Sequence, residues 1–162
     1  MWGHAYLQQA RSDWKSYKEI QKLPLDECHR LYYLRITTEK LGKAALLISG
    51  TYNLANIHKH RLFVKYLQLS TRNPKLCKTL GVSPDQLKPY IDSILSLAYS
   101  IQNLAPGEGN DGPNAEYPWE ISGTVYTPAS YKFPEARILG TIQGRKFLML
   151  VQSIIENFES IY

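Results

Sequence analysis

The sequence predicts an all-α protein, an antiparallel up-and-down bundle of about five helices with a long loop before the last helix. Apolar residues recur at steps of three and four in several long segments, which is the periodicity of amphipathic helices. The alternation typical of strands appears only briefly, over 124–127. A chain of 162 residues with 44% hydrophobic residues can bury a sizeable core, so we expect one domain spanning residues 1–162.

The first two helices are predicted at residues 4–22 and 26–50. Four side chains share one face of the first helix: Leu7, Ala10, Trp14 and Tyr17. Pro24 follows it, and proline cannot continue a helix because it lacks the backbone donor. The second helix begins with two acidic residues, and Gly50 stands where a C-terminal glycine is typical.

Three more helices are predicted at residues 57–71, 83–104 and 135–161. The second of these has a clear start at Ser83-Pro84-Asp85-Gln86, in which serine caps the helix and glutamine stands at its third position. Asn73-Pro74 ends the preceding helix. Together these five segments give the predicted bundle.

Residues 105–134 are predicted as the long loop, because they hold five of the nine prolines and four of the ten glycines. Loops of this length are uncommon in compact domains unless they have a function. This one also contains five aromatic residues, which a flexible linker would lack: Tyr117, Trp119, Tyr126, Tyr131 and Phe133. We therefore expect the aromatic side chains to hold the loop against the bundle.

The net charge of +5 is unevenly distributed along the chain. The stretch 40–84 contains eight lysines and arginines and no acidic residue. It either forms a positive face that attracts phosphates, or a solvated surface neutralised by acids elsewhere, such as Asp13. The candidate anion-binding residues are Lys59, Arg61, Lys65 and Arg72.

Several classes of protein are disfavoured by the sequence. No apolar run approaches the ~20 residues of a membrane span, and the N-terminus lacks the layout of a signal peptide, so we expect a cytoplasmic location without a membrane partner. Cys28 and Cys77 are expected to be reduced, with Cys28 in the core. His58 and His60 form the only close histidine pair and lack further ligands nearby, so neither a metal site nor a cofactor is predicted.

Arg35, Glu39 and Lys43 form a polar line along the second helix, spaced four residues apart. Residues at this spacing are neighbours on a helix surface. The line is open to three interpretations: a solvated ion-pair ladder, one wall of a cleft, or a contact with a second subunit.

The segment around this line resembles the second helix of HEPN domains, a family of small helical-bundle proteins found among prokaryotic toxins, defence proteins and partners of nucleotidyltransferases. The family's Glu-Lys-x-x-Lys-Ala core is matched by Glu39, Lys40, Lys43 and Ala44. The His-bearing segment 58–62 and the Tyr-Pro segment 115–120 are also similar to the family's. The resemblance implies a helical bundle, a homodimer, and a toxin–antitoxin or defence setting.

Nuclease members of this family use an arginine followed by a histidine after four to six intervening residues, and no arginine here has a histidine at that spacing. Glu116 also replaces the arginine that usually precedes Tyr-Pro. We therefore expect a HEPN-like binding or interaction module, with RNA, a nucleotide or an acidic protein as partner. The alternatives are a metal-independent endoribonuclease built around His60, with help from Arg61 or Lys43, and a bundle whose loop only covers a hydrophobic end.

Overall fold

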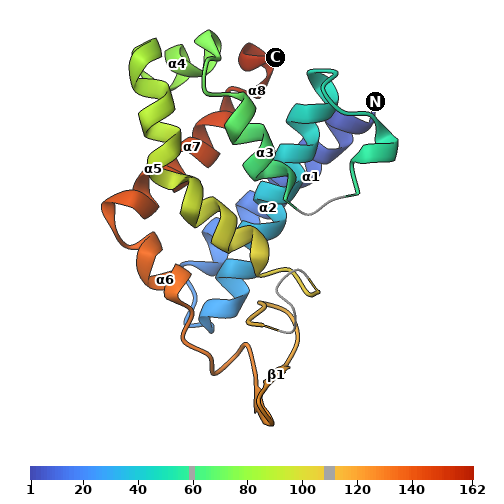
Figure 1. Cartoon of the computed structure of the whole chain (residues 1–162), viewed down its shortest axis with the longest axis vertical. Helices are drawn as coiled ribbons and strands as arrows, with labels where there is room; N and C mark the ends of the chain where they lie inside the picture. The colour runs from blue at the N-terminus through green and yellow to red at the C-terminus, as the bar shows by residue number, and fades with distance from the viewer. Residues whose placement is uncertain (59–60, 108–111) are drawn as a thin grey trace.

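The computed structural model describes residues 1–58, 61–107 and 112–162, and these residues are mostly helical, as predicted (Figure 1). The long helices are α1 (Trp2–Ile20), α2 (Glu27–Ile48), α5 (Pro84–Asn103) and α7 (Ile142–Glu156). The short ones are α3 (Leu62–Leu69), α4 (Pro74–Leu80), α6 (Pro134–Leu139) and α8 (Phe158–Ile161), with a 3-10 turn η1 (Leu54–Asn56). The sequence predicts about five helices, whereas the described residues hold eight α-helices.

Helices α1 and α2 run antiparallel and lie side by side (Figure 1). Gly3 at the start of α1 approaches Ile48 at the end of α2 so closely that an added Cβ would lie 2.5 Å from Ile48 Cγ1. Further along, Lys40 Nζ donates a hydrogen bond of 2.5 Å to Asp13 Oδ2. Gly50 follows α2 with a φ of 70°, the left-handed conformation that glycine adopts most easily. The predicted bounds of both helices agree with the structure to within two residues.

The main core lies where α2, α3, α5 and α7 meet. Phe63 of α3 and Phe147 of α7 are both 0% exposed, and their rings cross edge to face with centroids 6.2 Å apart. Leu41, Ile94 and Val151 extend this core along α2, α5 and α7. Burying each large apolar side chain contributes roughly 1.5–3 kcal/mol, so these contacts fix the helices to one another.

Helix α3 is shorter than the predicted 57–71, because the chain must first return along α2. After Gly50 it passes through η1 and reaches the level of Gly42, where α3 begins against the backbone of α2. An added Cβ on Gly42 would lie 2.5 Å from Phe63 N. Helix α5 does begin as predicted, with Ser83 N donating to Gln86 Oε1 at 3.1 Å.

The described part of the long loop contains an antiparallel hairpin that the sequence does not predict, formed by β1 (Trp119–Ile121) and β2 (Thr124–Tyr126). The hairpin projects from the helices (Figure 1). Ser122 and Gly123 join the strands with φ values of 52° and 79°, the positive pair that favours a two-residue hairpin turn. The sequence shows strand-like alternation only briefly here, and such short strands leave little more signal than this.

Aromatic residues hold this segment against the N-terminal part of α2, as the sequence predicts. Trp119, Tyr131 and Phe133 pack together with ring centroids 4.9–6.4 Å apart. Trp119 and Phe133 are buried in a second core cluster with Cys28 and Leu31 of α2. Cys28 and Cys77 are both free and buried, and burial raises the pKa of the Cys28 thiol, so this thiol is protonated at neutral pH.

The predicted last helix, 135–161, is divided into α6, α7 and α8. The first break follows Gly140, where Thr141 caps α7 by accepting a hydrogen bond from Gly144 N at 3.4 Å. The end of α6 folds back tightly, since a Cβ on Gly144 would lie 2.3 Å from Leu139 Cα. The second break is at Asn157, whose backbone leaves the helical conformation with φ −114° and ψ 22°. Small residues and helix caps thus end the helix at these two points, although the apolar periodicity continues through the whole segment.

Replacing Gly42 with alanine should destabilise the protein by about 3 kcal/mol, because the new methyl group would overlap the backbone of α3. Gly140→Ala is the matched control, since its Cβ would meet only Arg137 O at 3.4 Å. Urea unfolding followed by circular dichroism measures both variants. Equal stability of the two variants would contradict the close approach of α3 to α2.

Candidate functional site

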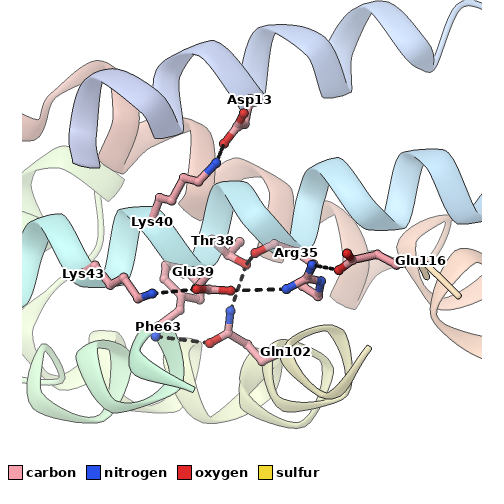
Figure 2. A network of polar contacts seen from close by, with 9 residues as sticks. All are labelled: Asp13, Arg35, Thr38, Glu39, Lys40, Lys43, Phe63, Gln102 and Glu116. Carbon is pink, nitrogen blue, oxygen red and sulfur yellow. Dashed lines mark hydrogen bonds and ion pairs between the residues drawn. The ribbon is translucent and has the colours of Figure 1, made fainter. Parts of the chain in front are cut away.

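The polar line on α2 is buried rather than solvated. Arg35 is 5% exposed and Lys43 is 8% exposed, and Glu39 between them is half-buried. All three side chains reach toward one another along the side of α2 that faces α3 and α5 (Figure 2). Of the three interpretations that the sequence leaves open, the ladder in open solvent is therefore wrong for this chain.

Glu39 joins the two cations, using one carboxylate oxygen for each. Its Oε2 accepts a hydrogen bond from Arg35 Nη1 at 3.2 Å, and its Oε1 accepts one from Lys43 Nζ at 2.7 Å. The four-residue spacing on the helix makes both contacts possible without distortion. Both cations also lie over aromatic rings: Arg35 is 5.7 Å from the ring centroid of Tyr32, and Lys43 is 5.6 Å from that of Tyr6.

A second carboxylate reaches Arg35 from the long loop. Glu116 Oε1 accepts a hydrogen bond and ion pair from Arg35 Nη2, across 81 residues of sequence (Figure 2). The loop is shaped for this contact by Asn114, whose Oδ1 accepts from the backbone N–H groups of Glu116 at 3.0 Å and Tyr117 at 2.7 Å. Asparagine commonly fixes a turn in this way. The aromatic cluster and this ion pair therefore anchor the same segment.

The four charged groups balance, since two carboxylates face one guanidinium and one ammonium. Their side chains are between 6% and 22% exposed, so water screens them weakly. Removing one partner of a buried ion pair leaves an uncompensated charge, which typically costs about 3–5 kcal/mol. A phosphate bound here would have to displace Glu39 or Glu116. The arrangement is thus suited to holding α2 and the loop together, and Lys43 is not a free cation for catalysis.

A neutral hydrogen-bond chain lies beside the charged one and connects three helices. Gln102 of α5, 1% exposed, donates from Nε2 to Thr38 Oγ1 at 3.2 Å and accepts from Phe63 N at 3.3 Å (Figure 2). Phe63 stands in the first turn of α3, where backbone N–H groups lack a partner within the helix. Gln102 therefore caps α3 and fixes its start against α2.

Acidic residues outside the stretch 40–84 neutralise part of its charge, as one interpretation of the sequence has it. Lys40 pairs with Asp13 of α1, which is 5% exposed and also accepts from Gln9 Nε2 at 3.1 Å. Lys43 pairs with Glu39. These two lysines stabilise the contacts of α2, so any positive face must come from the remaining cations.

The candidate anion-binding residues differ in exposure. Lys59 and the candidate catalytic residue His60 lie outside the described residues. Arg61 is half-buried, with its guanidinium 5.0 Å from the ring centroid of Tyr99. Lys65 on α3 and Arg72 after it are exposed, and neither forms an ion pair with any residue that the structure describes. Lys65 and Arg72 are therefore accessible to an external anion.

Two kinds of feature are absent from the described part of the chain. Across residues 1–58, 61–107 and 112–162, no three histidine, cysteine or acidic side chains come together in a way that could hold a metal ion. Over the same residues, no helix combines the length and the apolar character needed to cross a membrane.

Known proteins do not resolve the family. No protein-family model, curated protein or solved structure matches this chain. The resemblance to HEPN domains therefore depends on three sequence segments alone: the core of α2, residues 58–62 and residues 115–120.

The sequence predicts the polar line, but it does not predict the contacts of three polar residues nearby: Thr38, Gln102 and Glu116. Glu116 stands out in the sequence only as a replacement for an arginine, and its pairing with Arg35 requires knowledge of the loop's path. Thr38 and Gln102 each lie on the buried side of a helix, where a polar residue needs a hydrogen-bond partner. Burial therefore predicts that each of these side chains has a hydrogen-bond partner, but it does not predict that they are partners of each other.

Changing Glu39 to glutamine should lower the free energy of unfolding by about 3 kcal/mol, because Arg35 and Lys43 lose the carboxylate between them. Glu19→Gln removes the exposed pair with Lys22 on α1 and should change stability little. Denaturant unfolding of both variants at one pH measures the difference. If Glu39→Gln proves as stable as Glu19→Gln, the network does not contribute to holding α2 and the loop together.

Proposed function

We propose that this chain is a HEPN-like binding and interaction module acting in a prokaryotic toxin–antitoxin or defence setting. Its support is the resemblance of α2 and of the Tyr-Pro segment to that family, together with the mostly helical fold. The observation that favours a binding module over an enzyme is the internal pairing of Arg35 and Lys43 with Glu39 and Glu116. Arg35, Lys40 and Lys43 of the family-like helix are all engaged in ion pairs, so none of these three is free to bind a scissile phosphate.

The proposal includes an anionic partner, for which RNA is the first candidate. Lys65 and Arg72 are exposed and have no ion pair with any described residue, so they can meet phosphate groups at little desolvation cost. Lys75 and Lys78 on α4 add two exposed cations nearby in sequence. A homodimer, an antiparallel up-and-down arrangement of the whole bundle and a cytoplasmic location belong to the same proposal, since the family resemblance implies the first two.

The double substitution Lys65→Glu and Arg72→Glu should weaken binding of short single-stranded RNA at least tenfold at low salt, because each change replaces a phosphate-attracting charge with a repelling one. Fluorescence anisotropy over a series of salt concentrations measures this, and the wild-type affinity should fall steeply as salt rises. Lys15→Glu with Lys18→Glu on α1 is the control with the same change in net charge. Absence of RNA binding by the wild type at low salt would refute the choice of RNA.

The endoribonuclease alternative has one supporting observation, the placement of Arg61 directly after His60 and over the ring of Tyr99. A cation fixed in this way can stabilise phosphate charge in a transition state. Our proposal predicts no cleavage of short RNAs by the purified protein, measured by gel analysis without metal ions. If the wild-type protein cleaves RNA and His60→Ala abolishes that cleavage, our proposal is wrong and the endoribonuclease alternative is supported.

A further inference from the structure

Two adjoining cavities lie where α6 packs near the beginning of α2. The first, here called the inner cavity, has a volume of about 230 Å³, is lined by residues of α1, α2, α6 and α7, and is partly open to solvent. The second, here called the outer cavity, has a volume of about 570 Å³ and is bordered by the segment that leads into α6. The two share Glu27 and Ala136 as lining residues, so they adjoin each other. Neither contains a residue of the ionic network.

The inner cavity combines apolar walls with a single arginine. Leu31, Leu139 and Leu148 supply apolar surface, and Arg30 reaches the same space. Arg30 is half-buried, and it makes neither an ion pair nor a hydrogen bond with any described residue. Such an arginine keeps its fork of donors for a ligand, and a carboxylate can accept two of them at once.

Tyr17 of α1 lines the same cavity. It is 2% exposed, and burial raises its pKa to about 12, although the nearby charge of Arg30 and a hydrogen bond with the Gln21 side chain act in the opposite direction. Its hydroxyl therefore remains protonated at neutral pH and is held beside Gln21, which also lines the cavity. Arg30 and Tyr17 come from α2 and α1, two helices fixed to each other along most of their length. The donors are thus held in place before a ligand arrives.

The charges that line the two cavities favour an anion. Arg30, Lys132 and Arg137 are opposed by one carboxylate, Glu27, which gives a formal balance of three positive charges against one negative. Lys132 and Arg137 are exposed and face the outer cavity, where they can attract an anion from solution. Glu27 lies at the junction, and it raises the free energy of any anion that passes it.

We propose that the inner cavity binds a small organic carboxylate with an apolar body, its carboxylate on Arg30 and its body against Leu139 and Leu148. A volume of about 230 Å³ corresponds to about eight water volumes, at roughly 30 Å³ each. This matches an unbranched acid of about that many heavy atoms. A mainly apolar pocket with a few convergent polar groups is the common form of a small-molecule site.

Hexanoate tests the proposal, with hexanol as a neutral ligand of nearly the same apolar length. Titration of the full chain, followed by the methyl resonances of Leu139 and Leu148, should show that hexanoate binds at least tenfold more tightly than hexanol. Arg30→Gln should remove that preference, and Lys15→Gln on the exposed face of α1 should leave it unchanged. Glu27→Gln should tighten hexanoate binding severalfold, because a repelling carboxylate is lost, and it should leave hexanol binding unaltered.

Each other outcome overturns the proposal. Failure of hexanoate to shift these resonances at millimolar concentration excludes the site, and equal affinities of hexanoate and hexanol exclude the role of Arg30. Retained preference in Arg30→Gln does the same. Circular dichroism confirms that the variants are folded, and Arg30→Lys, which keeps the charge but loses the planar fork, should bind hexanoate with intermediate affinity.

Discussion

Arg35 and Lys43 place two positive charges on the side of α2 that faces the interior, and most of the structure around them is arranged to compensate these charges. Glu39 lies one helical turn from each and binds both. Glu116 is brought from the long loop to complete the balance. Isolated charges would be very costly in such weakly hydrated surroundings, so the loop must dock in one position. Compensation of charge on one helix thereby determines the path of a distant segment.

The lack of a side chain at Gly42 of α2 determines how closely α3 can pack against this helix. Gly42 lets the first turn of α3 touch the backbone of α2, and Gln102 of α5 then supplies the acceptor for Phe63 N in that turn. Because Gln102 also donates to Thr38, one amide group connects three helices. Close packing and hydrogen bonding therefore support each other at this point, which makes α2 the reference element of the fold.

The long helices could be predicted from sequence because their signals are local. Apolar periodicity, the proline after α1, Gly50 and the Ser83–Gln86 start all act within a few residues, and the predicted bounds of α1, α2 and α5 agree with the structure. The shorter elements depend on contacts distant in sequence. The start of α3 is set by Gly42 and Gln102, and the split of the last helix follows the packing of Gly144 on Leu139. No periodicity within 57–71 or 135–161 contains that information.

The candidate site shows the same division. Spacing alone places Arg35, Glu39 and Lys43 on one side of a helix. Whether that side is exposed or buried depends on how the loop, α3 and α5 pack against it. Glu116 is distinguishable in the sequence only as an unexpected acid before Tyr-Pro. Glu27 signals only the start of a helix and Arg30 gives no signal of a binding site, because their proposed role depends on the cavity between α2 and α6.

The pairing of Arg35 with Glu116 also has a kinetic consequence. The two residues are 81 positions apart, whereas Glu39 is available to Arg35 as soon as α2 forms. Local contacts form before those that close long loops, because loop closure carries an entropic cost. We expect α1, α2, α3 and α5 to associate first, and the hairpin segment to dock last, on a surface that already carries half of its charge compensation. Contacts that form after the transition state slow unfolding more than they speed folding. The docked loop would then slow unfolding more than it speeds folding, so its main effect would be to lengthen the lifetime of the folded protein.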